Sequence, residues 1–118
     1  ISRGDQNRRE YKYLNNFKLN IVIYSIIKNF EYLNKLAQKG VKTFFYPDVR
    51  WERFDIKSIF LLGNVLGANH GKKNKSHEAV LFDNRNMISE GNFFSIWIIK
   101  KNKCITNLIN FRILKGCT

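Results

Sequence analysis

The residue best suited to chemistry is Lys57, which lies between a charged, aromatic stretch at residues 50–55 and an apolar run at residues 59–66. An unprotonated lysine amine is a nucleophile. Partial burial and the nearby cations Arg50 and Arg53 would disfavour the charged amine and so promote loss of its proton. Most lysines are solvated surface charges, and that role is the alternative for Lys57.

The charge balance bears on possible partners. The chain has 118 residues, with 21 lysines and arginines against 9 acidic residues and a formal net charge of +12. The basic residues are spread along the whole chain, and the densest clusters, at residues 8–9 and 72–75, lack the interleaved aromatic side chains of a base-stacking platform. We therefore predict no specific nucleic-acid partner, only non-specific attraction to polyanions at low salt.

Cysteine and histidine spacing gives no metal site. Cys104 and Cys117 have no paired Cys-x-x-Cys motif, and His70 and His77 have no carboxylate or cysteine at ligand spacing. We predict no metal, and a reduced, cytoplasmic setting as the default for free thiols.

No membrane span is expected either. The longest apolar stretches, at residues 21–27 and 93–99, are much shorter than the roughly 20 residues of a spanning helix. The chain begins at Ile1 with no apolar signal region after it, and we interpret this start as cut.

The elements that must position Lys57 follow from hydrophobic periodicity and turn residues. Helices are predicted at residues 30–38, ended by Gly40, and at 59–66 after Ser58. Strands are predicted at residues 19–27, 41–46, 78–83, 87–90, 94–100 and 103–106, with hairpin turns at 83–86 and 101–102. This mixture predicts a mixed α+β fold.

Two of these elements carry specific expectations. The β-branched, apolar residues 19–27 are typical of a buried strand. In the helix after Ser58, apolar residues at 59, 62, 65 and 66 share one face, which predicts a buried helix that begins just after Lys57. Gly67 and Gly71 weaken its far end by roughly 1 kcal/mol each relative to alanine, so we expect fraying before Lys72.

A series of short blocks in this order and at these separations resembles the class IV aminotransferases, with the greatest similarity to the members that act on D-amino acids such as D-alanine. The blocks are Asp48-Val49-Arg50-Trp51, Asp55-Ile56-Lys57-Ser58 with Leu61-Leu62-Gly63, Glu78-Ala79-Val80-Leu81, Ser89-Glu90-Gly91 and Ile113-Leu114-Lys115-Gly116-Cys117-Thr118. Upstream, Arg3-Gly4 followed by Arg8 is similar to a further family segment.

The resemblance implies a partial fold-type IV enzyme that uses pyridoxal 5'-phosphate. Lys57 matches the family lysine, whose amine forms an internal Schiff base with the cofactor aldehyde and then moves a proton. Glu90 matches the carboxylate that keeps the cofactor's pyridine nitrogen protonated. The alternative for Glu90 is a glutamate at a strand end in a surface hairpin.

The remaining site residues implied by the resemblance bind the cofactor phosphate and the substrate. The cofactor-binding set is Lys57, Glu90, Gly91, Asn92, Ser95, Cys117 and Thr118. Relatives have small polar residues after Glu-Gly, whereas Phe93 and Phe94 here offer no hydroxyl donors, so reduced cofactor affinity is expected. Arg8 matches the arginine that clamps a substrate carboxylate, although Glu10 replaces a family histidine.

By the same resemblance, residues 1–30 are the end of a small domain, residues 31–40 connect the domains and residues 41–118 are part of the cofactor-binding domain. We expect a truncated or split gene product whose intact form is a homodimer acting on amino acids and 2-oxo acids. Within the family, branched-chain aminotransferase and aminodeoxychorismate lyase activities stay open. A catalytically inactive remnant, acting as a basic interaction module, is the alternative from a different class.

Overall fold

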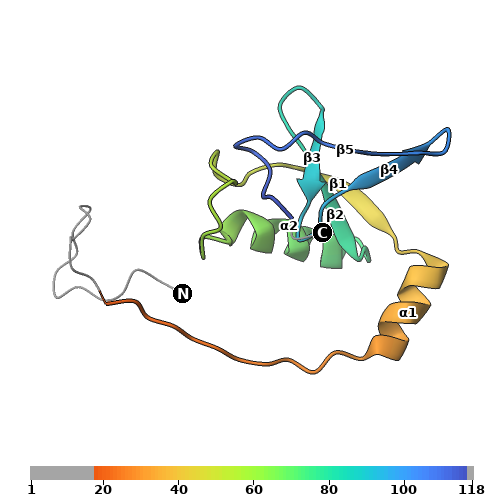
Figure 1. The fold of residues 1–118 in the computed structure, drawn as a ribbon. Coiled ribbons are helices and arrows are strands. Elements are labelled where there is room, and N and C mark those ends of the chain that lie inside the picture. Colours follow the sequence, from red (N-terminus) through yellow and green to blue (C-terminus); the bar gives the residue numbers. More distant parts are fainter. Residues whose placement is uncertain (1–17, 117–118) are drawn as a thin grey trace. The chain divides into compact units, whose positions relative to one another are not determined.

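The computed structural model describes residues 18–116 and shows both helices and strands, which confirms the mixed α+β class (Figure 1). The chain divides into two compact units, residues 1–33 and 34–118. The elements are α1 (Phe30–Lys39), β1 (Thr43–Pro47), α2 (Leu62–Lys73), β2 (Glu78–Phe82), β3 (Ile88–Gly91), β4 (Trp97–Lys100) and β5 (Lys103–Thr106).

A three-stranded sheet in the order β1-β2-β3 forms the framework of the second unit. β1 runs parallel to β2, and the connection between them contains α2, whereas β2 and β3 form an antiparallel hairpin. Central strand β2 alternates between half-buried and buried residues, and its Ala79 and Leu81 are the buried apolar core. The carboxyl end of β1 and the start of β3 thereby lie at the same end of the sheet, on either side of Phe82 in β2.

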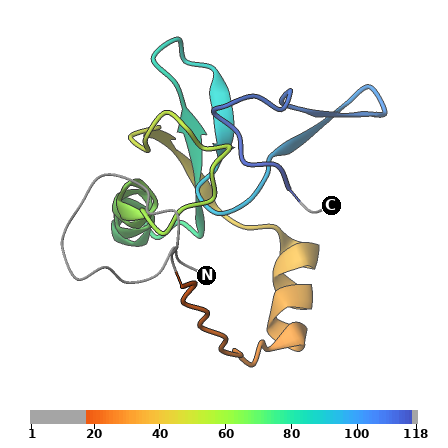
Figure 2. The ribbon, with the colours of Figure 1, turned by 60° about the vertical axis from the view of Figure 1, so that its left-hand side comes forward.

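Helix α2 packs on β1 and β2, as both ribbon views show (Figure 2). The face turned to the sheet consists of glycine rather than the predicted apolar side chains: Gly67 and Gly71 are buried, whereas Leu62, Val65 and Leu66 are exposed. A Cβ on Gly71 would lie 2.7 Å from Phe44 Cε1. Glycine lets the helix approach the aromatic side chains of β1 closely, so the predicted buried face of this helix was wrong.

The bounds of α2 also differ from the prediction. The helix begins at Leu62, and Ser58 does not cap it, because the Ser58 hydroxyl accepts a hydrogen bond from the Phe60 N–H (3.2 Å) in the preceding turn. The predicted fraying before Lys72 was wrong as well. Backbone N–H groups of Asn74 and Lys75 bond to carbonyls of the last turn and stabilise it through Lys73.

The predicted strand at residues 19–27 was wrong. Apart from an isolated bridge at Asn20, residues 18–29 are irregular, and apolar side chains such as Ile23 and Ile27 are at least 90% exposed. A β-branched apolar run favours a strand only where another strand supplies hydrogen-bonding partners. No such ladder forms for these residues in the part of the chain that the structure describes.

The short local elements agree with the prediction. The Asn29 side chain accepts a hydrogen bond from the Tyr32 N–H (3.0 Å) at the start of α1, and Gly40 ends this helix with φ +73°. Lys101 and Asn102 both have positive φ, as a type I′ turn requires, and join β4 to β5 in an antiparallel hairpin. β4 begins at Trp97 rather than residue 94, because residues 92–94 form a tight bend after β3.

Candidate functional site

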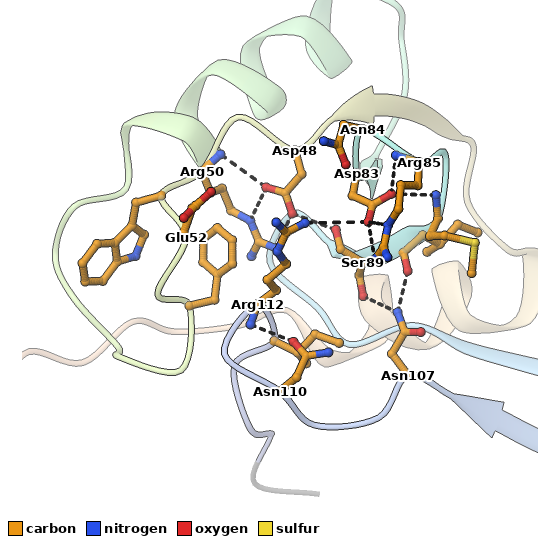
Figure 3. Close-up of a pocket in the computed structure, with 15 residues that line it drawn as sticks. Asp48, Arg50, Glu52, Asp83, Asn84, Arg85, Ser89, Asn107, Asn110 and Arg112 are labelled. Carbon is orange, nitrogen blue, oxygen red and sulfur yellow. Dashed lines mark hydrogen bonds and ion pairs between the residues drawn. The ribbon is translucent and has the colours of Figure 1, made fainter.

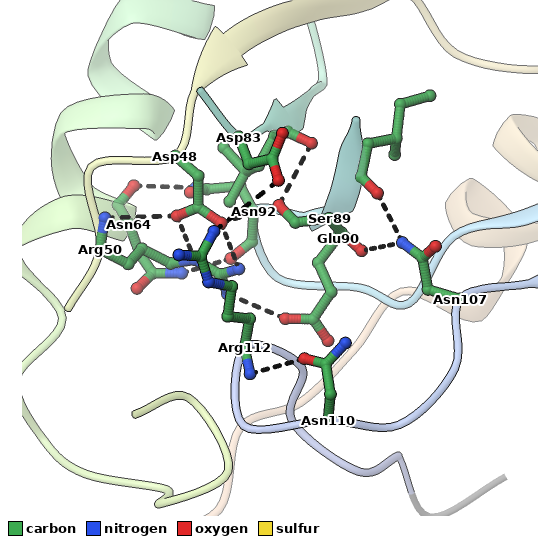
Figure 4. A network of polar contacts seen from close by, with 12 residues as sticks. Asp48, Arg50, Asn64, Asp83, Ser89, Glu90, Asn92, Asn107, Asn110 and Arg112 are labelled. Carbon is green, nitrogen blue, oxygen red and sulfur yellow. Dashed lines mark hydrogen bonds and ion pairs between the residues drawn. The ribbon is translucent and has the colours of Figure 1, made fainter. Parts of the chain in front are cut away.

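Three charged side chains meet beside the carboxyl end of β1. Asp48 follows β1 directly and is tied to β2 by a hydrogen bond from its N–H to the Phe82 carbonyl (2.8 Å). Arg50 is two residues further on, and Glu90 is in β3. Figure 4 shows the Arg50 guanidinium between the two carboxylates (Figure 4). We name Asp48, Arg50 and Glu90 the carboxylate-arginine cluster.

The guanidinium of Arg50 uses separate donors for each carboxylate. Nε donates to Asp48 Oδ1 and Nη2 to Asp48 Oδ2, both at 2.9 Å, while Nη1 donates to Glu90 Oε2 at 2.9 Å. The side chains of the three residues are only 8–9% exposed. The guanidinium also lies 3.6 Å from the centre of the Phe54 ring. These contacts hold Arg50 in one orientation, which a planar, five-donor group favours.

Ser89 extends the cluster along β3. Its hydroxyl donates to Asp48 Oδ2 (2.7 Å), while Asn107 Nδ2 donates to the Ser89 carbonyl (2.7 Å). The strand that carries Glu90 is thus tied on one side to the residue after β1 and on the other to the segment after β5.

A cavity of about 360 Å³ adjoins the cluster (Figure 3). Its polar lining comprises Asp48, Arg50, Glu52, Asp83, Asn84, Arg85, Ser89, Asn107, Asn110 and Arg112. Lys57 and Glu90 are not among the lining residues. This cavity is therefore not a place where those two side chains meet.

The cluster sets the charge state of Asp48. Burial by itself raises the pKa of this carboxyl, but hydrogen bonds from Arg50 and Ser89, together with the Arg50 charge, outweigh it and hold the pKa below the usual 3.8. The pKa of Arg50 is raised, because the two carboxylates outweigh the effect of its burial. Arg50 is a cation and Asp48 an anion throughout the physiological range.

Acid is expected to destabilise the fold through Asp48. Because the pKa is lowered on folding, this contribution to stability is complete above the ordinary value of 3.8 and is lost as the pH falls through the lower folded value. The free energy of unfolding, measured by urea denaturation from pH 6 to pH 2.5, should fall below about pH 4, and Asp48→Asn should flatten that fall. The pKa of Asp83 is also lowered, first by a hydrogen bond from the Met87 backbone, so some acid sensitivity should persist in the variant. Equal slopes for the two proteins would contradict the assignment.

The structure corrects the expected surroundings of Lys57. The residue is exposed in the irregular segment before α2, so the predicted partial burial was wrong. Arg50 is paired with Asp48 and Glu90, and Arg53 is paired with Asp55 at 2.7 Å. Both cations that were expected to suppress the charged amine are engaged by carboxylates, because each lies two residues from an aspartate.

Glu90 is buried, with 7% of the residue exposed, and is not a surface glutamate. Gly91 is also buried, and a Cβ at this position would lie 2.6 Å from the Phe94 carbonyl oxygen. The Gly91 N–H donates to this same oxygen at 2.8 Å. The absence of a side chain at Gly91 therefore lets the bend that follows it in the chain fold back closely against it.

Asn92 fastens that bend to α2. Its Nδ2 donates to the Asn64 carbonyl (2.8 Å), and its backbone N–H donates to the Ala79 carbonyl (2.9 Å). Asn92 Oδ1 is buried without a hydrogen-bond partner in the part of the chain that the structure describes. A Cβ on Gly67 would lie only 2.9 Å from this oxygen. The structure gives Asn92 a packing role between helix and sheet.

The other predicted site residues are not brought to the cluster by the described structure. Ser95 is exposed, as are Phe93 and Phe94. Arg8, Cys117 and Thr118 lie outside the described residues, as does Glu10.

The buried Glu90 carboxylate and its neighbours fit one end of pyridoxal phosphate, the ring nitrogen. A buried carboxylate with one oxygen, Oε1, outside its ion pair suits a protonated ring nitrogen. At the phosphate end, the described residues 91–94 offer no hydroxyl, and the N–H groups of Gly91 and Asn92 are already bonded. The fit thus depends on Glu90 and its neighbours.

Sequence reasoning missed the partnership between Arg50 and Glu90. The spacing Asp48-x-Arg50 was a usable signal, since an arginine two residues from an aspartate can bond it locally. Arg50 and Glu90 are 40 positions apart in the chain, so no local spacing indicated the second contact.

Among residues 18–116, no three histidine, cysteine or acidic side chains gather in an arrangement that could hold a metal ion. Among the same residues, none of the helices combines the length and apolar character needed to cross a membrane.

Comparison with known proteins gives the family. A D-alanine aminotransferase of Staphylococcus epidermidis (strain RP62A) is 33% identical over 97 residues, which is 82% of this chain and 34% of that protein. The D-alanine aminotransferase of Listeria monocytogenes serotype 4b (strain F2365) is 32% identical over 118 residues, all of this chain and 40% of that protein. That of Bacillus licheniformis is 33% identical over 84 residues, 71% of this chain and 29% of that protein.

The chain thus spans between about three tenths and two fifths of the length of these curated relatives. The family model for amino-transferase class IV matches residues 1–118. With the whole chain matched and relatives above 30% identity, the chain belongs to the class IV aminotransferase family.

Proposed function

We propose that the protein containing this chain is a pyridoxal-phosphate-dependent transaminase that moves an amino group between a D-amino acid of the alanine type and a 2-oxo acid such as 2-oxoglutarate. Family membership and the names of the relatives support the reaction class. The structural observation that carries the proposal is the buried Glu90 carboxylate at the end of β3, where an ionised group is costly unless it has a partner.

When bound, pyridoxal phosphate supplies an aldehyde that takes up the amino group and a ring that accepts electrons. In this proposal Glu90 accepts a hydrogen bond from the ring nitrogen and holds a proton there. The Lys57 amine carries the cofactor and moves a proton at the substrate Cα. Residues 41–118 belong to the cofactor-binding domain.

The remaining assignments rest on the resemblance alone. The phosphate would be held by Ser95, Cys117 and Thr118, because the N–H groups of Gly91 and Asn92 are already bonded within the chain. Arg8 would bind the substrate carboxylate with its two-pronged guanidinium. We propose that the assembled enzyme is a homodimer. Cys104 is a free, exposed thiol, in keeping with a cytoplasmic location.

Covalent trapping of the cofactor on Lys57 tests the proposal. The purified chain is mixed with pyridoxal phosphate, its visible absorption is recorded, and borohydride is added before peptide mass spectrometry. A visible band and a cofactor mass on the peptide containing Lys57 are expected, and Lys57→Ala should lose both. Lys42→Ala is the control, because Lys42 is an exposed lysine whose amine donates to the Asn74 carbonyl (3.2 Å).

The exposure of Lys57 favours a second candidate, a non-catalytic remnant that acts as a basic interaction module. The net charge of +12 suits such a module. The trapping experiment separates the two candidates, because the absence of both the band and the adduct in the wild-type chain would exclude catalysis by it. If trapping succeeds, comparing D-alanine with L-leucine as amino donor distinguishes the D-amino-acid reaction from that of a branched-chain aminotransferase.

A further inference from the structure

The contacts of Arg50 point to a role for this residue that none of the matching motifs assigns to it. Glu90 reaches its buried position on a side chain with three rotatable bonds, and holding such a side chain in one rotamer costs conformational entropy. The hydrogen bond from Arg50 Nη1 to Glu90 Oε2 (2.9 Å) anchors that side chain at its tip. The other carboxylate oxygen, Oε1, takes no part in this ion pair.

Arg50 can serve as an anchor because it is itself held from several sides. Two hydrogen bonds of 2.9 Å join it to Asp48, and the Phe54 ring lies against the guanidinium at 3.6 Å. On the helix side, a Cβ on Gly63 would lie 3.0 Å from both Cα and Cγ of Arg50. The absence of a side chain at Gly63 therefore lets α2 pack directly on Arg50.

The charges of the carboxylate-arginine cluster do not cancel. One guanidinium faces two carboxylates, and all three side chains are less than a tenth exposed. Asp48 takes two of the three side-chain donors that Arg50 uses, so Glu90 is the less compensated carboxylate. The remaining negative charge suits a cationic partner at Glu90, such as a protonated pyridine nitrogen.

We propose that Arg50, held by Asp48, is a positioning residue that fixes the carboxylate of Glu90 so that Oε1 meets the ring nitrogen of the cofactor. Arg50 acts through Glu90 and does not contact the reacting atoms. The part that concerns the cofactor rests on the proposed function, whereas the control of Glu90 by Arg50 is a property of the chain alone.

The first arm of the test needs no cofactor. The full chain is prepared with 13C-labelled glutamate, and the side-chain carboxyl signal of Glu90 is assigned with Glu90→Gln. In the wild type this signal should be separate from that of the exposed Glu52, and in Arg50→Met it should move toward the Glu52 signal. Arg50→Lys keeps the positive charge but lacks the planar guanidinium with its several donors, and it should disturb the fold less. It should therefore give a smaller shift in the same direction. An unchanged Glu90 signal in both variants would overturn the proposal.

The second arm reads the ring nitrogen itself, using pyridoxal phosphate labelled with 15N in the ring. The wild-type complex should show the resonance of a protonated pyridine nitrogen. Arg50→Lys should shift it toward the unprotonated position and weaken cofactor retention, whereas a merely structural role would leave the resonance in place. Arg85→Lys is the matched control, because Arg85 pairs with Asp83 at 3.2 Å and is 77% exposed.

The two arms keep the two proposals apart. A wild-type chain that takes up no pyridoxal phosphate contradicts the proposed function, and the 13C arm still decides whether Arg50 fixes Glu90. A wild-type chain that binds the cofactor, together with Arg50 variants that keep the wild-type 15N resonance, overturns the positioning role and leaves the proposed function standing.

Discussion

Arg50→Met is expected to lower the free energy of unfolding by about 3–5 kcal/mol, the usual cost of removing one partner from a buried ion pair. Methionine fills a similar volume but leaves the carboxylates of Asp48 and Glu90 uncompensated in a region where the side chains are 8–9% exposed. The contact of the guanidinium with the Phe54 ring is lost as well. Urea denaturation at pH 7, followed by circular dichroism, measures the change.

Arg53→Met is the matched control for this prediction. Arg53 pairs with Asp55 across the same two-residue spacing as Arg50 and Asp48, but its side chain is 56% exposed. Exposed ion pairs contribute little, because water and salt screen them. The loss in Arg53→Met should therefore be much smaller than that in Arg50→Met, and equal losses would show that burial of the cluster does not matter.

Gly91→Ala is expected to destabilise the fold by about 1–3 kcal/mol, the range for an added methyl in a tightly packed place. The new Cβ would lie 2.6 Å from the Phe94 carbonyl oxygen, which accepts the hydrogen bond from the Gly91 N–H. This neighbour is backbone and cannot rotate away, so the bend at residues 91–94 must open. Thermal and urea unfolding, with the 13C signal of Glu90 as a local probe, report the change.

Gly40→Ala separates the two reasons for which a glycine can be needed. Gly40 has φ +73° with nothing within 4 Å of a Cβ, so alanine there meets backbone strain of about 1–2 kcal/mol but no clash. Gly91, in contrast, is not among the glycines with positive φ. If crowding decides the outcome, Gly91→Ala alone should disturb the Glu90 signal. An undisturbed signal in Gly91→Ala would contradict the crowding argument.

Several of the elements predicted correctly have a local cause. Helix α1 depends on Asn29 at its start and Gly40 at its end, and the hairpin of β4 and β5 depends on Lys101 and Asn102. Each of these causes acts within a few residues of the chain. The mixed α+β class follows from such local signals, and the family follows from blocks of residues that can be read in order.

The wrong predictions concern what packs against what. Residues 19–27 have the composition of a strand but no partner strand in the described part of the chain. In α2, apolar periodicity predicted the buried face, whereas the small size of Gly67 and Gly71 decided it by allowing close approach to the sheet. A pattern of apolar residues shows which side chains favour burial, and only the neighbouring elements determine whether a surface is there to bury them.

For the candidate site too, residue types could be read from the sequence, whereas burial and long-range contacts could not. The sequence by itself determined Lys57 and Glu90 as chemically suitable residues, because an amine and a carboxylate can be recognised from their type and the blocks around them. Only the tertiary structure decided that Lys57 is exposed and that Glu90 is buried against Arg50, 40 residues away in the chain. The pairing of β2 with β1 and β3 brings Arg50 and Glu90 together, and contacts between strands depend on the whole sheet rather than on any one segment.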